Sequence, residues 1–376
     1  MSEALELSEQ SRARSLLDMV RGRVKLAEGG STFVDAVGKP VKVPAIRGLV
    51  PADLVLIVYH TLDDRTLAWV VRADGIKGVS LASGRRVLDD QVRELRRAII
   101  ERSPTTTTVA RGLHDVLIAP LELREGERVV FVPHSVLHYL PFAALRGPRG
   151  WLVEERAVAS APSASALIAI MQRPFLDQTQ VLALGNPDLG EARLALPGAE
   201  REVQEIRAIY PTASVFTRRD ATKERFVTAA PENTLVHVAT HATVDDIDPL
   251  YSMIRLSAGD GRIGDLEAHE VYGLRLDKTR VVVLSACATG MGRVASGDEF
   301  LGFERVFLGA GARTLIVTLW PIVDVSTARL MTTFYKDLKS QPVADALRQA
   351  QIEMIRSPQY SDPVFWAAFS AVGDWR

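Results

Sequence analysis

Cysteine is almost absent from this chain: its 376 residues include one, Cys287. A single thiol excludes an internal disulfide and suits a reducing compartment. An excess of charge of either sign is also missing, because 45 Lys and Arg stand against 46 Asp and Glu. This balance argues against direct binding of nucleic acid or of an anionic membrane. Long apolar runs are lacking as well: "TLIVTLWPIV" is far shorter than the roughly 18 residues of a membrane span.

The first 20 residues carry acids and arginines scattered among apolar positions, with no apolar block behind a charged head. They do not match a secretory signal, so we expect a soluble protein of the cytoplasm. A hydrophobic content of 47% and a charged content of 24% are ordinary for a globular chain. The length predicts about two domains.

Residues 1–44 form the first predicted part. Apolar positions recur at helical spacing over residues 4–20, and the loop-like stretch "AEGGSTFVDAVGKPVKVP" follows. Two interpretations of this helix are open. It is either the last helix of a longer helical array or a clasp on the domain that follows.

Residues 45–173 form the second predicted part. The strand-like runs "LVLIVYHT" and "TLAWVVRADG" are joined by an acidic turn, and a helix is predicted over residues 85–101. The composition of "SPTTTT" predicts a loop, after which a helix at 110–118 leads to the buried-type strand "RVVFVPH".

Residues 174–376 form the third predicted part, in which apolar strands alternate with helical patterns. This alternation predicts an α/β fold, with a mostly parallel sheet and helices on both faces. The final run, "FWAAFSAVGD", is either a last strand or a closing apolar segment. The expected strands are "QVLALGNP", "SVFT", "TLVHVATH", "TRVVVLSAC" and "TLIVTLW", and the expected helices cover 198–210, 222–229, 298–310, 324–338 and 343–355.

Two expected strands finish on reactive side chains, "LVHVATH" on His241 and "VVVLSAC" on Cys287. Ligands of an open parallel sheet collect at the carboxyl ends of its strands, so neighbouring strands would bring both residues to one edge. An imidazole that takes or balances the proton of a thiol activates it as a nucleophile. Glycines after Cys287 would let a substrate carbonyl approach backbone N–H groups. The residue pattern leaves a second interpretation open, in which Cys287 is a small buried hydrophobe.

Several motifs, in order along nearly the whole chain, resemble the CHAT family of caspase-like clan CD cysteine peptidases, which are distantly similar to separase. They are "VVFVPHSVLHYLPFAALRG", "APSASAL", "VHVATHA", "VVVLSACATGMG", "LGFERVFLGAGARTLIVTLWPIVDVSTARLM" and "FWAAFSAVGD". Members are often attached to tetratricopeptide-repeat (TPR) arrays. The resemblance implies a caspase-like three-layer α/β sandwich.

By this resemblance, Cys287 and His241 are a catalytic dyad, and the backbone N–H groups of Cys287 and Ala242 hold the oxyanion. Ala288 stands where many members carry an acid, a departure that leaves the dyad intact. The implied activity is an intracellular cysteine endopeptidase, needing neither metal nor other cofactor. It would act on a protein substrate and be gated by a regulatory protein or a TPR-like sensor. The alternative is a catalytically silent caspase-like scaffold for protein–protein interaction.

The resemblance also implies that residues 45–173 are a degenerate caspase-like domain without a cysteine. Its His134 and His138 are spaced as a helix would present two ligands, but Pro133 and Pro141 bracket them. We therefore expect both histidines to be structural.

Asp324 is the candidate acid for binding a basic P1 residue, since separases carry an acid in a similar place after the strand that ends at Trp320. The alternative is that Asp324 is an N-cap or first-turn acid of the helix that follows, where carboxylates are favoured anyway. Trp320 and Asp188 are further candidates for substrate binding; Asp245 and Asp246 are acids near the predicted cleft.

Two other patterns are given structural interpretations. "GDGRIG" matches a dinucleotide fingerprint, but its context predicts a hairpin followed by a helix that Asp265 caps. Glu299 and Glu304 are expected on the solvent face of the helix at 298–310.

Overall fold

The computed structural model describes residues 2–10, 16, 46–48, 50–176, 178–245, 247–258, 264–286, 293–295, 299–322 and 324–376. The chain divides into two compact units. The first comprises Met1–Arg173 with Val294–Phe300 and Gly373–Trp375, and the second comprises Pro174–Arg293, Leu301–Val372 and Arg376. That the first unit is a degenerate caspase-like domain stays a prediction.

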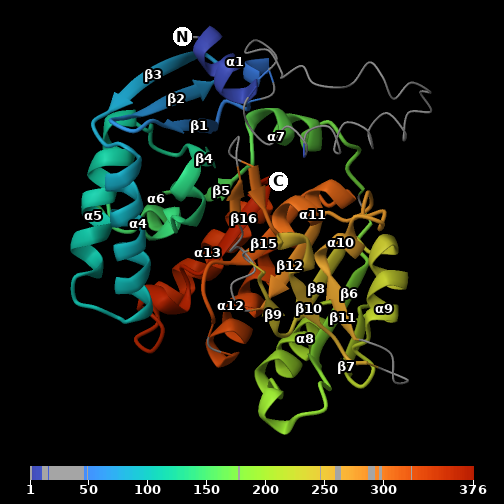
Figure 1. Cartoon of the computed structure of the whole chain (residues 1–376). Helices are drawn as coiled ribbons and strands as arrows, with labels where there is room; N and C mark the ends of the chain where they lie inside the picture. Colours follow the sequence, from blue (N-terminus) through green and yellow to red (C-terminus); the bar gives the residue numbers. More distant parts are fainter. Residues whose placement is uncertain are drawn as a thin grey trace, which may run out of the picture. The chain divides into compact units, whose positions relative to one another are not determined.

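The first unit contains a five-stranded run with the order β3-β2-β1-β4-β5 (Figure 1). The first three strands of the chain form an antiparallel meander, whereas β4 runs parallel to both β1 and β5. The strands are β1 Leu54–Thr61, β2 Thr66–Arg72, β3 Gly75–Leu81, β4 Arg128–Val132 and β5 Val158–Ser160, and the helices are α1 Ser2–Gln10, α4 Arg85–Ile100, α5 Thr106–Leu117, α6 Leu152–Glu155 and α7 Ala164–Met171.

Helix α4 confirms the helix predicted from residue 85, because Leu88, Val92, Leu95 and Ile99 fall on one face and are buried. The expected "SPTTTT" loop is partly wrong, since α5 begins at Thr106, within the threonine tract. The Thr106 hydroxyl donates to the carbonyl of Ala98, 3.0 Å away. Packing of α5 against α4 therefore overrides a composition that is poor in helix formers.

Helix α1 is attached to α7 through a buried carboxylate. Glu9 accepts hydrogen bonds from the backbone N–H and the hydroxyl of Ser165, each at 2.9 Å. Such a contact favours the clasp interpretation of this helix. The predicted helix extended to residue 20, and residues 11–15 and 17–20 lie outside the described part.

The second unit is an α/β fold built on a large, mostly parallel sheet with the order β16-β15-β12-β8-β6-β7. The pairs β15/β12, β12/β8, β8/β6 and β6/β7 are parallel, which confirms the predicted sheet. Its strands are β6 Val181–Pro187, β7 Ser214–Arg218, β8 Leu235–Ala239, β12 Val281–Ser285, β15 Thr314–Thr318 and β16 Phe369–Gly373, and its helices are α8 Pro197–Ile209, α9 Lys223–Ala229, α10 Ala268–Val271, α11 Phe303–Ala310, α12 Asp324–Asp337 and α13 Val343–Arg356.

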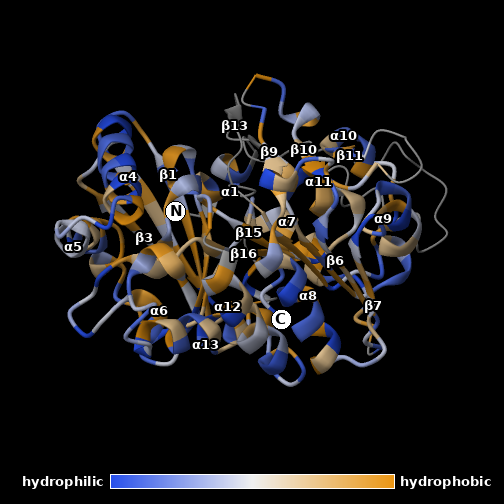
Figure 2. Cartoon of the chain, turned by 90° about the horizontal axis from the view of Figure 1, so that it is seen from below, coloured by the Kyte–Doolittle hydropathy of each residue, from blue (hydrophilic) through white to orange (hydrophobic). Residues whose placement is uncertain are grey.

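Helices cover both faces of this sheet, as expected for strands that are apolar throughout (Figure 2). On one face α12 packs between α8 and α13. On the other, Phe226 of α9 meets Phe307 of α11 edge to face, with ring centroids 6.4 Å apart. The alternative left open for the final run is settled, because β16 is a strand of the sheet.

The helix predicted at 298–310 starts later than expected. Glu299–Leu301 form β14, which pairs with β13, Arg293–Ala295, and α11 begins only at Phe303. Glu304 was expected to face solvent, and this was wrong, because it is 8% exposed. It shares the buried face of α11 with Phe303 and Phe307, at helical spacing. The side chain of Glu299 lies outside the description.

A small antiparallel sheet of order β11-β10-β9 follows β8, from strands β9 Ala242–Thr243, β10 Met253–Arg255 and β11 Asp265–Glu267. The β10/β11 pair confirms the predicted hairpin around "GDGRIG", of which residues 259–263 lie outside the described part. The predicted cap was wrong: Asp265 is a strand residue opposite Arg255, and Glu267 caps α10. Among the described residues, no helix is both long and apolar enough to cross a membrane.

Candidate active site

The carboxyl ends of β8 and β12 lie side by side at one edge of the parallel sheet. The two strands are parallel neighbours, with Val283 opposite His237 and Ser285 opposite Ala239. This confirms the arrangement on which the sequence argument depended. His241 follows β8 by two residues. Thr240 N–H donates to the carbonyl of Ser285 at 3.2 Å, so the segment that follows β8 stays hydrogen-bonded to the end of β12.

The ring of His241 is fixed by a backbone carbonyl. His241 Nε2 lies 3.0 Å from the carbonyl oxygen of Leu194, the last residue of the short 3-10 helix Ala192–Leu194. A carbonyl oxygen only accepts hydrogen bonds, so Nε2 carries the proton of the neutral ring. The other nitrogen, Nδ1, then carries the lone pair of the ring and can accept a hydrogen bond.

A cavity of about 60 Å³ opens beside His241. Four segments converge on it: the end of β8, the end of β12, the start of α8 and the segment that enters α12. Its lining residues are Leu196, Ala199, Glu202, Thr240, His241, Ser285, Ala286, Ile322 and Thr327. The carboxyl ends of two parallel strands and the side of a helix therefore enclose the candidate site, as expected for an open α/β sheet.

Cys287 lies outside the described residues, and so does the glycine-containing stretch up to residue 292. The residue before it, Ala286, is described. Ala286 is 3% exposed and lines the cavity, and its carbonyl accepts a hydrogen bond from the hydroxyl of Thr318 at the end of β15. Ala286, which directly precedes position 287 in the sequence, is therefore part of the cavity wall that His241 also lines.

Ala242, the expected oxyanion donor, begins the edge strand β9. Arg255 N–H donates to the carbonyl of His241 at 2.9 Å, so residues 241 and 255 form a hydrogen-bonded pair. Hydrogen-bonded and non-hydrogen-bonded pairs alternate along an antiparallel ladder, so the next pair, Ala242 and Ile254, is non-hydrogen-bonded. In such a pair the backbone N–H groups point away from the partner strand. The N–H of Ala242 is consequently directed away from β10.

The expected substrate-binding residues are not among the described lining of this cavity. Trp320 is 1% exposed, and its indole N–H donates to the carbonyl of Val364 at 3.2 Å. Asp188 lies 3.3 Å from Arg219, and its pKa is lowered, first by the N–H of Gly190 and then by that arginine. Asp324 begins α12, between the lining residues Ile322 and Thr327, and its side chain lies outside the description.

Of the acids near the cleft, Asp245 orders the turn after β9. It accepts hydrogen bonds from the N–H groups of Ile247 and Asp248, each at 2.8 Å. These bonds lower the pKa of Asp245 and give it a structural task. Asp246 lies outside the described residues.

Sequence reasoning missed two residues of the site, Glu202 and Leu194. Glu202 lines the cavity, and it could have been found because it shares the apolar face of α8 with Ala199 and Ile206. The carbonyl of Leu194 carries no signal in the sequence, since any residue has one. Beside Glu202 lies His237, which is fully buried, with Nε2 3.0 Å from Glu202 and Nδ1 3.0 Å from the Tyr335 hydroxyl.

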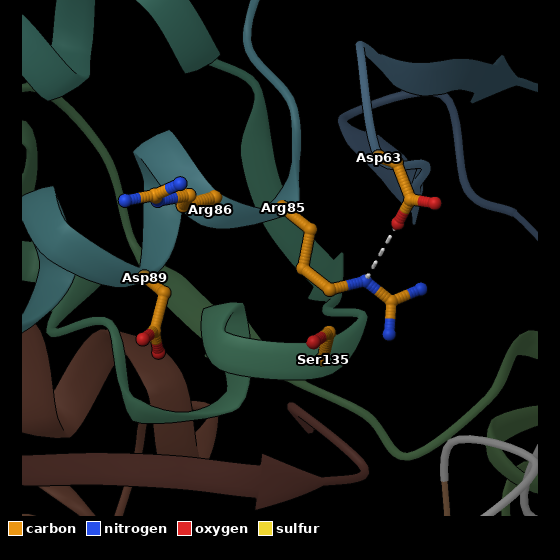
Figure 3. Close-up of a pocket in the computed structure, with 5 residues that line it drawn as sticks. All are labelled: Asp63, Arg85, Arg86, Asp89 and Ser135. Carbon is orange, nitrogen blue, oxygen red and sulfur yellow. Dashed lines mark ion pairs between the residues drawn. The ribbon is translucent and has the colours of Figure 1, made fainter.

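The first unit contains a larger open cavity of about 580 Å³, lined by Asp63, Arg85, Arg86, Asp89 and Ser135 (Figure 3). Arg85 reaches across it toward Asp63, at 3.6 Å, and Asp89 pairs with Arg93 at 3.0 Å. The mixed charges largely compensate one another. Nearby His134 accepts from the N–H of Thr61 at 3.2 Å and packs on the ring of His60. These contacts agree with its expected structural role.

Comparison with known proteins assigns the class. The family model described as "CHAT domain" matches residues 107–374, so the chain belongs to the CHAT domain family. A solved structure of the separase–securin complex of Saccharomyces cerevisiae covers 88% of this chain, with a TM-score of 0.60 and 10% sequence identity, and this chain covers 30% of the matched one. The fold is therefore caspase-like, and similar to that of the separase complex.

Two curated relatives are similar over 70% of the chain, and both are named tetratricopeptide repeat protein 28. The human protein is 26% identical over 325 residues and the mouse protein 25% identical over 336 residues. The present chain spans 13% of the length of either relative.

Proposed function

We propose that this protein is a cysteine endopeptidase of the cytoplasm, in which Cys287 is the nucleophile and His241 its acid–base partner. The observation that carries the proposal is the hydrogen bond from His241 to the carbonyl of Leu194. It leaves Nδ1 as the proton-exchanging atom of a ring whose cavity is also lined by Ala286. The proposed nucleophile, Cys287, directly follows this wall residue in the sequence.

The chemistry follows from these two groups. A thiol of ordinary pKa is only a few per cent ionised at neutral pH, so proton transfer to Nδ1 of His241 supplies the reactive thiolate. The sulfur attacks the scissile carbonyl, and the developing oxyanion is held by the N–H groups of Cys287 and Ala242. The outward direction of the Ala242 N–H supports that assignment. His241 then protonates the leaving amine, and water hydrolyses the thioester.

The proposed specificity is for Arg or Lys at P1, through Asp324. Support comes from its position, since Ile322 and Thr327 on either side of it line the cavity. The ion pair of Asp188 with Arg219 makes Asp188 the weaker candidate for this role. Trp320 would act only by shaping the pocket from within the core.

A regulatory protein or a helical-repeat segment is the proposed gate. The relatives of this chain carry the name of the tetratricopeptide repeat, and the chain matches only a part of them. We propose that such a repeat array, in the same polypeptide or in a partner, controls access to the site.

The test compares wild-type protein with Cys287→Ala in proteome-wide profiling of new N-termini, with candidate repeat proteins present. New termini that need Cys287 support the endopeptidase. Their absence in every mixture, together with no reaction of Cys287 with an acyloxymethyl-ketone probe, would contradict it and leave the interaction scaffold. Equal thermal unfolding of both proteins is the control for an intact fold.

A further inference from the structure

Asn186, near the end of β6, is a fully buried amide in an unusual backbone conformation. Its φ is +48°, a left-handed value that asparagine tolerates better than most side chains. It lies where the register of β6 against β7 shifts, between Gly185 and Pro187. The irregularity turns this side chain out of the regular ladder and toward the start of α8.

Both polar atoms of the Asn186 amide are engaged. Its Oδ1 accepts a hydrogen bond from the backbone N–H of Leu196 at 2.7 Å, and its Nδ2 donates to Oε2 of Glu200 at 2.8 Å. A backbone N–H only donates and a carboxylate only accepts, so the two partners fix the orientation of the amide. Glu200 is held in turn by Nε of Arg218 at 2.7 Å.

The segment that Asn186 holds, residues 194–196, contacts the candidate histidine, His241. Leu196 lines the cavity beside His241, and the carbonyl two residues earlier, that of Leu194, fixes Nε2 of His241 at 3.0 Å. Leu196 precedes α8 without a side-chain cap of its own. The amide of Asn186, on β6, therefore anchors the start of α8 to the sheet.

We infer that Asn186 is a positioning residue: its amide sets the place of the Leu194 carbonyl and thereby the orientation of His241. The inference rests on the proposed function, because an oriented imidazole has a chemical task only if it exchanges a proton with Cys287. A loss of alignment of this kind lowers the rate constant of the reaction more than it lowers substrate affinity.

The first test replaces Asn186 by glycine, which keeps the left-handed conformation accessible and removes the amide. The second-order rate of alkylation of Cys287 by iodoacetamide near pH 7 is expected to fall roughly 10-fold. In a His241→Ala background the same substitution is expected to change nothing, because the ring that it positions is gone. The matched control is Asn233→Gly, which removes an amide bonded to the Ala229 carbonyl at 2.8 Å elsewhere in the unit.

The second test does not depend on a glycine being tolerated. Asn186→Asp keeps the acceptor for Leu196 N–H but sets a carboxylate against that of Glu200, and the alkylation rate is expected to fall. Adding Glu200→Gln restores the hydrogen bond with exchanged roles, because the glutamine amide donates and the aspartate carboxylate accepts. The alkylation rate of this double variant should return to within about threefold of that of Glu200→Gln alone.

The outcomes distinguish a failure of the positioning inference from a failure of the proposed function. If His241→Ala slows alkylation but Asn186→Gly and Asn186→Asp do not, the positioning inference is wrong and the dyad stands. It is wrong as well if the Asn186 and His241 effects simply multiply, or if Glu200→Gln fails to rescue Asn186→Asp in protein that unfolds at the wild-type temperature. If His241→Ala leaves the alkylation rate unchanged, the proposed function itself fails.

Discussion

The imidazole Nε2 of His237 lies 3.0 Å from a carboxylate oxygen of Glu202, and the two side chains are 0% and 2% exposed. The distance suits an ion pair, although the ring N–H is poorly aligned for a hydrogen bond to that oxygen. On its other side the ring meets the hydroxyl of Tyr335 at 3.0 Å. Burial and the nearby carboxylate of Glu202 raise the pKa of Tyr335, which keeps that hydroxyl protonated.

This buried pair is expected to behave as a unit. His237→Phe removes the imidazole that faces the buried carboxylate of Glu202 and should lower the free energy of unfolding by about 3–5 kcal/mol, because the carboxylate stays buried without that partner. The double variant with Glu202→Leu should recover part of that loss, since no buried charge remains. Urea denaturation of the single and double variants measures the coupling, and strictly additive losses would show that the two groups do not interact.

His241→Ala is expected to slow alkylation of Cys287 about 10-fold near pH 7, because the thiolate then forms only through the ordinary pKa of the thiol. Above about pH 10 the thiol is ionised without help, so the rates of wild type and variant should converge. Alkylation followed by mass spectrometry from pH 6 to 10 measures both limbs. His269→Ala, at a partly exposed histidine of the same unit, is the control. If the alkylation rates of wild type and His241→Ala depend on pH in the same way, the proposed dyad is contradicted.

Asp324→Asn should lower kcat/KM for substrates with Arg at P1 at least about 30-fold, because it removes a charge that pairs with the guanidinium. This fold-change corresponds to a loss of about 2 kcal/mol of transition-state stabilisation. Substrates with apolar P1 residues should be affected little. A fluorogenic peptide library measured on both proteins checks the difference. Asp188→Asn is the matched control, since Asp188 already pairs with Arg219. An unchanged P1 profile in Asp324→Asn would exclude the proposed specificity acid.

Glu304 is expected to make the protein less stable as the pH rises. Burial raises the pKa of Glu304 from 4.5 to about 8, so the folded state keeps a proton that the unfolded state loses between these values. The folded state then binds more protons, and the free energy of unfolding falls as the pH rises through this window, by at most roughly 1.4 kcal/mol per pH unit. Glu304→Gln should flatten this dependence. Denaturant midpoints at pH 5, 6.5 and 8 measure it, and identical slopes for both proteins would refute the assignment.

The periodicity of the sequence was sufficient for the parallel sheet of the second unit, because strands buried on both faces must be apolar throughout. It failed for Glu304 and for the threonines of α5, where packing against neighbouring elements outweighs composition. It also missed β3, a strand rich in glycine and only partly buried, which β2 holds through a regular antiparallel ladder.

The sequence by itself determined which side chains are available for chemistry, a lone Cys287 and a His241 that each follow an apolar strand. Only the tertiary structure decided that β8 and β12 are parallel neighbours, and that the carbonyl of Leu194 and the amide of Asn186 lie within hydrogen-bonding reach of their partners. The physical reason is that strand pairing and backbone contacts join segments far apart in the chain, and a backbone carbonyl has the same chemistry at every position.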